Sequence, residues 1–166
     1  MAEVFLGLGS NLGDRVGQLR RAVLAIEGFV SVEQVSSLWL TEPVGLRDQP
    51  PFMNVALQGH TALDPRALLA AMAEIEDRMG RRRDVPNGPR TIDLDLLLYE
   101  GVVVDEPGLT LPHPRMSQRR FALAPLAEIA PEVRPRAEGP TVAELLAALP
   151  AAEAVERIEH PGWPMR

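Results

Sequence analysis

Two aspartates in the run T-I-D-L-D-L-L-L-Y, residues 91–99, have the spacing that most directly indicates chemistry. Alternate side chains of an extended chain share a face, so Asp93 and Asp95 are expected together, opposite a row of Ile92, Leu94, Leu96 and Leu98. Neighbouring carboxylates repel each other unless a cation lies between them. Oxygen ligands of this kind suit Mg²⁺, which keeps its remaining positions for water and substrate phosphates. The pair therefore predicts a magnesium site for phosphate chemistry.

Arginines surround this stretch in an otherwise acidic chain. Guanidinium groups bind phosphate oxygens in a fork geometry. A net charge of -6 argues against general nucleic-acid binding, which relies on a basic surface. A local anion site fits the uneven distribution better. The residues concerned are Arg78, Arg81, Arg82, Arg83, Arg90, Arg115, Arg119 and Arg120.

Two residue types are absent from the sequence, and their absence excludes several classes of enzyme. All 17 basic residues counted as Lys+Arg are arginine, and there are 0 cysteines. Without lysine, a Walker A loop, the strand lysine of protein kinases and Schiff-base chemistry are excluded. Without cysteine, disulfides, a thiolate nucleophile and cysteine-ligated zinc are excluded. Arginine and metal must therefore neutralise any triphosphate.

The glycines of the segment G-L-G-S-N-L-G, residues 7–13, suggest a nucleotide-binding loop at first sight. Their spacing departs from the dinucleotide fingerprint, because Leu12 stands where the third glycine belongs. A nucleophile elbow is also excluded, since Leu8 and Leu12 flank Ser10 where glycines are needed. A tight strand-to-helix turn is the preferred interpretation.

Length and composition predict one domain over residues 1–166. Hydrophobic residues make up 46% and charged residues 24%, which is ordinary for a globular protein. No apolar run reaches membrane-spanning length, and the first residues lack a basic leader before an apolar region. We expect a cytoplasmic protein without membrane partners.

The elements that must position these residues follow from periodicity and turn signals. Strands are expected at 4–8, 29–40, 52–60 and around Asp93 and Asp95, with a turn near Glu100-Gly101 and a short partner strand at 102–104. Helices are expected from an Asp14 cap to about Glu27, from Asp64-Pro65 to Gly80, and over 141–149. Segments 41–51 and 80–90 are expected to be loops, and the tail from Glu159 to be loosely held.

The order strand, helix, strand, strand, helix, strand predicts an α+β fold. Two such units, split and interleaved, form a ferredoxin-like βαββαβ antiparallel sheet with both helices on one face. The remaining elements are expected as C-terminal additions.

Motifs along the chain resemble those of the 6-hydroxymethyl-7,8-dihydropterin pyrophosphokinase family of folate biosynthesis. They come in the order found in that family and span roughly the first 130 residues, which is more specific than any single motif. They are G-S-N-L-G-D-R at 9–15, D-Q-P-P-F-M-N at 48–54, G-P-R-T-I-D-L-D-L-L at 88–97 and L-P-H-P-R-M at 111–116, followed by R-R-F-A-L-A-P-L.

The resemblance implies transfer of the β,γ-pyrophosphoryl group of ATP to the pterin hydroxymethyl group, with release of AMP. Asp93 and Asp95 match the pair that binds two Mg²⁺ ions. The implied catalytic residues are Arg81, Arg90 and Asp95. The positions that match contacts to ATP, the co-substrate, are Glu76, Arg81, Arg83, Arg90, Thr110, His113 and Arg119.

The resemblance also implies a slot for the pterin. Asn54 matches the residue that reads the pterin edge by hydrogen bonds, and Phe52 and Phe121 match the aromatic residues of the slot. Thr41 and Val44 lie in the loop that flanks it. The implied partners are therefore two small molecules, ATP and the pterin, bound by a monomer.

Two positions depart from the family pattern. Asn87 stands where relatives often carry tryptophan before Gly-Pro-Arg, and Ala73 aligns with an often-seen glutamine. These differences concern loop closure and nucleotide affinity. Two alternatives stay open from the residues themselves: another two-metal nucleotide transferase on the same sheet, and a regulatory domain that binds nucleotide or pterin without chemistry.

Overall fold

The computed structural model describes residues 1–41, 50–80, 91–150 and 155–163. Its main sheet has the strand order β5-β1-β4-β3-β8, with β2 also paired to β4, and every pairing in it is antiparallel. A separate hairpin is formed by β6 and β7. The strands are β1 Ala2–Ser10, β2 Ser31–Val35, β3 Leu38–Thr41, β4 Phe52–Thr61, β5 Asp93–Tyr99, β6 Val104–Glu106, β7 Leu109–Leu111 and β8 Val155–Ile158.

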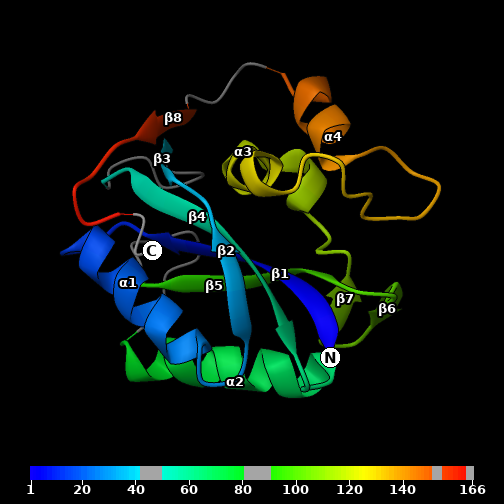
Figure 1. Ribbon diagram of the computed structural model, residues 1–166, viewed down its shortest axis with the longest axis horizontal. Helices are drawn as coiled ribbons and strands as arrows, with labels where there is room; N and C mark the ends of the chain where they lie inside the picture. Colours follow the sequence, from blue (N-terminus) through cyan, green and yellow to red (C-terminus); the bar gives the residue numbers. More distant parts are fainter. Residues whose placement is uncertain (42–49, 81–90, 151–154, 164–166) are drawn as a thin grey trace.

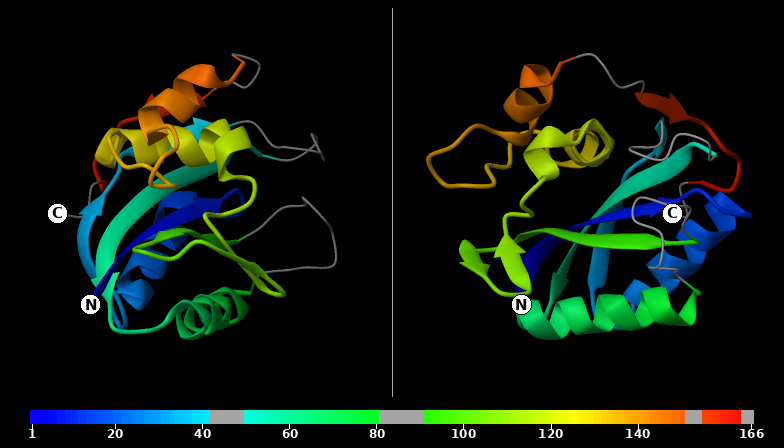
Figure 2. Two further views of the ribbon diagram at one scale, coloured as in Figure 1. Left: turned by 90° about the vertical axis from the view of Figure 1, so that its right-hand side faces the viewer. Right: turned by 180° about the vertical axis from the view of Figure 1, so that it is seen from behind.

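Helices cover both faces of this sheet (Figure 1). Helix α1 (Arg15–Ile26) and helix α2 (Pro65–Arg78) pack on one face, while α3 (Arg120–Ile129) and α4 (Val142–Ala148) lie on the other. Figure 2 shows the sheet between these two layers. A short 3-10 turn, Met116–Gln118, leads into α3. The order β1-α1-β2/β3-β4-α2-β5 confirms the ferredoxin-like α+β prediction, and α3, α4 and β8 are additions to it.

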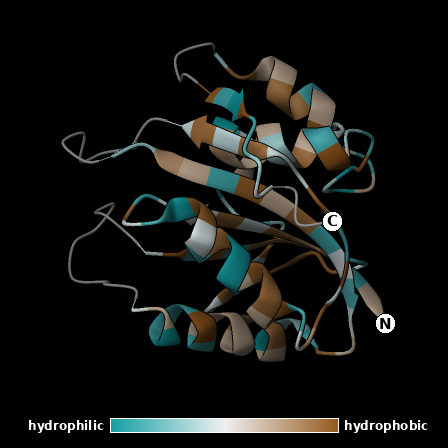
Figure 3. Ribbon diagram, turned by 60° about the vertical axis from the view of Figure 1, so that its left-hand side comes forward, coloured by the Kyte–Doolittle hydropathy of each residue, from teal (hydrophilic) through white to brown (hydrophobic). Residues whose placement is uncertain are grey.

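The first helical layer forms because its caps and apolar stripes agree with the sequence pattern. Asp14 and Asp64 each accept a backbone N–H three residues on, from Gly17 and Ala67, so both predicted N-caps are confirmed. Apolar side chains of α1 and α2 meet the inward side chains of the strands in one core. Figure 3 shows brown, apolar stretches along the strands and mixed colouring along the helices, as expected for elements half exposed to water.

The predicted strand 29–40 is wrong as one element, because Ser36 divides it. Backbone N–H of Ala56 in β4 bonds the Ser36 hydroxyl at 2.9 Å instead of a carbonyl. The Ser36 carbonyl instead accepts the indole N–H of Trp163 at 2.8 Å. A serine side chain thus competes with the sheet ladder and breaks β2 from β3.

Leu98 does not share the face of Ile92, Leu94 and Leu96, contrary to expectation. The pairing of β5 with β1 shifts register between Phe5 and Leu6, so Leu97 stands opposite no β1 residue. Beyond this bulge the alternation reverses, and Leu98 packs beside Phe5 in the second core, under α3 and α4.

Two further predictions fail in the C-terminal half. The strand expected at 102–104 is β6, Val104–Glu106, and it pairs with β7 rather than with β5. The described part of the tail, residues 159–163, is not loose: Trp163 is only 7% exposed and packs in the main core. The turn at Glu100-Gly101 and the capped helix after Thr141 are confirmed. In the described ranges no helix is long and apolar enough to cross a membrane.

Candidate active site

The two aspartates lie together on the sheet face that carries α3. Asp93 stands opposite Gly9 of β1 and Asp95 opposite Gly7, while Leu94 between them points into the core on the other face. Directly opposed residues of antiparallel strands share a face. The expected juxtaposition of Asp93 and Asp95 is therefore confirmed, and both side chains are half-buried.

Gly9 links the aspartates to Asn54 across the sheet. Asn54 of β4 is the residue opposite Gly9, so Asp93, Gly9 and Asn54 form one row on three adjacent strands. A methyl group on Gly9 would lie 2.5 Å from the Asn54 side-chain oxygen. The missing side chain of Gly9 therefore leaves the space that the Asn54 amide occupies, and the backbones at the two ends of the row are about 10 Å apart, from two strand spacings. Gly9 therefore lies between a carboxylate pair and a buried amide.

The amide of Asn54 is held in one orientation. Its Nδ2 donates to Thr41 Oγ1 at 2.7 Å, and the two residues are 6% and 4% exposed. Because Nδ2 is used in this way, Oδ1 faces the Gly9 side, where an N–H of a ligand would find an acceptor. Phe52 stands opposite Thr41 and shares this face. Thr41, Phe52 and Asn54, three predicted pterin contacts, are thus brought together.

His113 approaches the aspartates from the segment after β7. Its Nε2 lies 3.6 Å from Asp95 Oδ1, with the two side chains 19% and 29% exposed. Backbone N–H of His113 donates to Leu97 O at 3.0 Å, which fixes the segment beside β5. Nδ1 accepts the N–H of Arg115 at 3.3 Å, so the ring proton of neutral His113 is on Nε2, facing Asp95.

Glu76 of α2 binds the backbone of β5, the strand that carries the two aspartates. It is 5% exposed on α2, and its Oε2 accepts the backbone N–H of Leu94 at 2.8 Å. Leu94 lies between Asp93 and Asp95, on an edge strand whose outer N–H would otherwise lack a ladder partner. Glu76 therefore fixes the backbone on which both aspartates stand.

Comparison with known proteins identifies the family. The family model for 7,8-dihydro-6-hydroxymethylpterin-pyrophosphokinase (HPPK) matches residues 5–131. The 2-amino-4-hydroxy-6-hydroxymethyldihydropteridine pyrophosphokinase of Bacillus subtilis is 46% identical over 135 residues, 80% of this chain and 81% of that protein. The protein of the same name from Methylorubrum extorquens is 43% identical over 161 residues, 96% of this chain and 100% of that one.

The chain belongs to the HPPK family. Its fold agrees: a crystal structure of Plasmodium falciparum HPPK-DHPS, 16% identical, matches with a TM-score of 0.71. The match covers 88% of this chain and 43% of that longer chain. The family and enzyme class that the motifs predict, a pyrophosphokinase, are confirmed.

The donor set suits the magnesium expected in an HPPK enzyme. In the described ranges, no group of three or more His, Cys, Asp or Glu side chains could hold a metal by itself. Mg²⁺ does not need one, since it commonly takes one or two carboxylates and completes its shell with water and phosphate. Asp93 and Asp95 are half-buried, so part of each carboxylate is accessible to water and to a ligand.

Other predicted contacts of the HPPK site fall into three groups. Arg119 and Phe121 stand at the start of α3, with the guanidinium carbon 5.3 Å from the ring centroid, a cation–π contact. Thr110 is half-buried on β7 and its hydroxyl bonds Asp105 of the same hairpin at 3.1 Å. Val44, Arg81, Arg83 and Arg90, with Asn87, lie outside the described residues and stay predictions.

The glycine-rich turn after β1 has a role that sequence reasoning missed. Asn11 Nδ2 donates to Pro50 O and Arg15 Nη1 to Pro51 O, each at 2.9 Å. Both carbonyls lie just before β4, so the turn anchors the chain that leads to Phe52 and Asn54. The structural interpretation of this segment is thus supported. The D-Q-P-P-F-M-N motif was a usable signal, because its two prolines have no backbone N–H to donate to a helix or sheet ladder.

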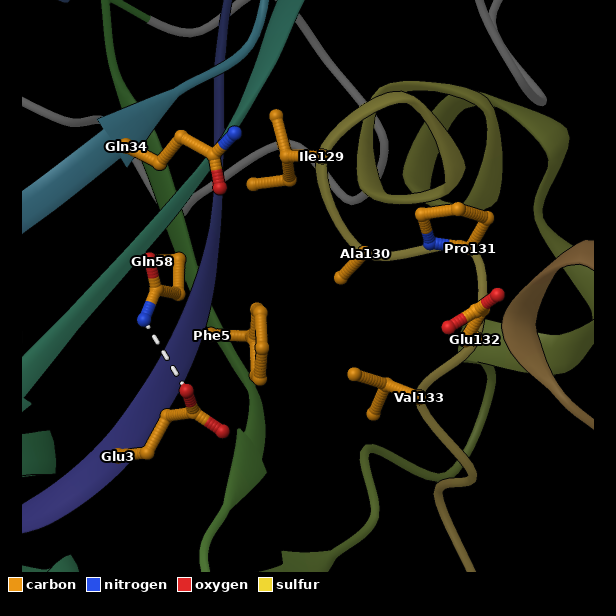
Figure 4. Close-up of a pocket in the computed structure, with 9 residues that line it drawn as sticks. All are labelled: Glu3, Phe5, Gln34, Gln58, Ile129, Ala130, Pro131, Glu132 and Val133. Carbon is orange, nitrogen blue, oxygen red and sulfur yellow. Dashed lines mark hydrogen bonds between the residues drawn. The ribbon is translucent and has the colours of Figure 1, made fainter.

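A separate pocket of about 430 Å³ lies farther along the same sheet face (Figure 4). Phe5 and Gln58, which oppose each other on β1 and β4, form one wall, and Ala130 and Val133 beyond α3 form another. Phe5 is two residues from Gly7, which stands opposite Asp95, but no lining residue of the pocket is a predicted ATP, metal or pterin contact. This pocket is therefore distinct from the aspartate site.

Proposed function

We propose that this chain transfers the pyrophosphoryl group of ATP to the hydroxymethyl group of 6-hydroxymethyl-7,8-dihydropterin and releases AMP. The observation that carries the proposal is the row Asp93, Gly9 and Asn54. A carboxylate pair suited to metal-bound phosphates and an amide suited to a pterin stand on one face, with Gly9 between them. The relatives' names supply the pterin and the pyrophosphoryl transfer.

In the proposed reaction the pterin hydroxymethyl oxygen attacks the β-phosphorus. The bond from that phosphorus to the oxygen bridging the α-phosphate breaks, AMP leaves with that oxygen, and the hydroxyl proton is released. Phosphoryl transfer leaves a protein little covalent work, so catalysis comes from positioning and charge stabilisation. Two Mg²⁺ ions, when bound, would polarise the β-phosphorus and neutralise charge on the departing AMP.

The chain's own residues have the following proposed roles. Asp93 and Asp95 hold the metal-bound triphosphate, and His113 presents its Nε2–H at the same edge. Asn54 Oδ1 accepts a pterin N–H while Thr41 fixes the amide. Phe52 and Phe121 enclose the ring, and Arg119 lies over Phe121. Glu76, Thr110, Arg81, Arg83 and Arg90 complete the ATP site, and Val44 flanks the pterin.

The proposal includes a monomeric protein of the cytoplasm that uses small-molecule substrates and binds no nucleic acid. The net charge of -6 supports the last point. Sedimentation at micromolar concentration should give one species with the mass of a single chain.

The test of the metal site is the substitution Asp95→Ala. Loss of a metal-binding carboxylate should lower the rate of AMP formation by about 10²–10³-fold or more, as for the loss of one electrostatic transition-state contact. Folding should be intact, because removing one of two like charges relieves repulsion. AMP and the pyrophosphorylated pterin are quantified together, and thermal unfolding is measured on the same sample.

A matched control is Glu106→Gln, which removes a carboxylate from a surface pair with Arg66 at 2.7 Å. Its rate should equal that of the unsubstituted protein. Activity retained in Asp95→Ala would contradict the metal assignment. Formation of ADP, or no product from the unsubstituted protein with both substrates and Mg²⁺, would contradict the reaction itself.

A further inference from the structure

Glu128, near the C-terminal end of α3, binds the broken strand β2–β3 through several hydrogen bonds. Its carboxylate accepts the backbone N–H of Ser37 at 3.1 Å, the Ser37 hydroxyl at 2.7 Å and the indole N–H of Trp39 at 2.9 Å. Hydrogen bonds to an ionised acceptor are stronger and more directional than neutral ones. This carboxylate therefore fixes one end of α3 to the sheet.

Trp39 connects this anchor to the proposed pterin site. It is the residue of β3 that stands opposite Asn54, and Thr41 follows two positions later. Residues two apart on a strand share a face, so Trp39, Thr41, Asn54 and Phe52 lie on the same side of the sheet. The indole that Glu128 holds is thus the neighbour of the amide expected to read the pterin.

Phe121 is placed by the same helix. It precedes Glu128 by seven residues, nearly two turns, so the two side chains project from the same face of α3 about 10 Å apart along the axis. Helix α3 packs against β3 and β4, as Figure 1 also shows. Pro125 lies inside α3 between the two residues and has no backbone N–H for the Phe121 carbonyl, so the helix does not hold its own geometry over this length. Buried Leu123 and Leu126 and the bonds at Glu128 together determine how far Phe121 stands from the sheet.

We propose that Glu128 is a positioning residue for the pterin. Together with the buried apolar side chains of α3, it fixes the distance of this helix from β3 and β4, so that Phe121 closes a slot of defined width over Phe52 and Asn54. The inference rests on the proposed function, since it names a further residue that serves the same site. Glu128 contacts the sheet and not the substrate, so its effect is on pterin affinity rather than on chemistry.

The test compares KM and kcat of Glu128→Ala, Glu128→Gln and Trp39→Phe. In Glu128→Ala the Michaelis constant for the pterin should rise about tenfold, while that for ATP and kcat change by less than about threefold. Glu128→Gln keeps one acceptor oxygen and should recover part of the loss. Trp39→Phe keeps the ring but lacks the N–H, so it should raise the pterin constant by itself and add little to Glu128→Ala.

Two controls separate positioning from general destabilisation. Trp163→Phe removes a hydrogen bond to Ser36, at the same strand break, without touching α3. Glu132→Gln removes a charge just beyond α3, where the side chain is exposed. Both should leave the Michaelis constant for the pterin unchanged, and thermal unfolding of every variant is measured alongside.

An unchanged pterin constant in Glu128→Ala would overturn the proposal, as would an equal rise in Trp163→Phe or an equal loss of affinity for ATP. These outcomes are read only after the unsubstituted protein has formed AMP and pyrophosphorylated pterin in the same assay. Failure of that reference reaction would count against the proposed function, and failure of the variants alone would count against the role of Glu128.

Discussion

At the scale of single residues, the site depends as much on missing side chains as on present ones. Gly7 and Gly9 stand opposite Asp95 and Asp93, and neither has a side chain on the sheet face that carries the carboxylates and Asn54. Thr41 then holds the Asn54 amide so that its oxygen faces Gly9. The chemistry assigned to each charged or polar group thus requires small neighbours.

Substitution Gly9→Ala tests this requirement. The added methyl would lie 2.5 Å from Asn54 Oδ1, a distance that forces the amide to move. We expect the Michaelis constant for the pterin to rise about tenfold, equal to about 1.4 kcal/mol, with a smaller effect on that for ATP. Steady-state kinetics with each substrate varied in turn measures both.

Gly7→Ala is the matched control for that prediction. Its methyl would make an ordinary contact, 3.4 Å from the nearest Leu97 methyl, and it faces no pterin residue. An equal rise of the pterin constant in both variants would contradict the specific clash with Asn54.

At the scale of elements, side-chain caps fix where α1, α2 and α4 start, whereas α3 has none. Asp14, Asp64 and Thr141 are all followed three residues later by a backbone N–H that bonds the cap. For α4 the cap is reciprocal, because the Glu144 carboxylate accepts the backbone N–H of Thr141 at 3.0 Å. Such local signals can be read from a sequence because both partners are near neighbours in the chain.

The capping box of α4 predicts a pH dependence. The hydrogen bonds from the backbone N–H and then the hydroxyl of Thr141 lower the pKa of Glu144 from its ordinary value. A carboxyl group whose pKa is lower in the folded state than in the unfolded state stabilises the fold at pH values above the unfolded-state pKa. This stabilisation is lost as the pH falls through the folded-state pKa. Glu144→Gln should therefore be less stable than the unsubstituted protein at pH 7, and the difference should shrink on acidification below the ordinary carboxyl range.

Chemical denaturation at a series of pH values measures this difference. Glu138→Gln, which changes an exposed carboxylate outside α4, is the matched control and should show no such dependence. A difference that is constant from pH 7 to pH 3 would contradict the account.

At the scale of the whole molecule, the tail is part of the sheet structure. β8 pairs with β3, and Trp163 returns to the core and bonds Ser36 at the strand break. Arg20 of α1 also donates to the carbonyl of Gly162. Residues nearly at opposite ends of the chain thus close the layer that carries Trp39 and Thr41.

Removal of the indole should weaken the entire fold. Trp163→Ala is expected to lower the free energy of unfolding by about 3–5 kcal/mol, because a large buried side chain leaves a cavity. Leu24→Ala, an exposed apolar position at 56% exposure, is the control and should change stability by less than about 0.5 kcal/mol. Thermal and urea denaturation with two probes would show the loss, and an unchanged midpoint would mean that the tail does not contribute to the core.

From residue order alone one could not predict β7, α3 or β8, but one could predict the βαββαβ core, the caps of α1, α2 and α4, the carboxylate pair on β5 and the family. These depend on neighbours in the chain or on short motifs, so periodicity and residue type suffice to predict them. Phe5 opposite Leu98, the Ser36 break and the docking of Trp163 could not be predicted in this way. They result from strand register and from partners up to 127 residues apart, as for Trp163 and Ser36.

Only the tertiary structure placed Asn54 across Gly9 from Asp93, and only it joined Glu128 to Trp39. Neither pair has a signature in the chain, because which strands are neighbours and which face a helix covers are decided when the whole apolar surface is buried together. The residue types for phosphate chemistry could be recognised in the sequence, and those for the pterin followed from the family motifs. Their common face, and the helix that covers it, arise from how the sheet and its two helical layers pack.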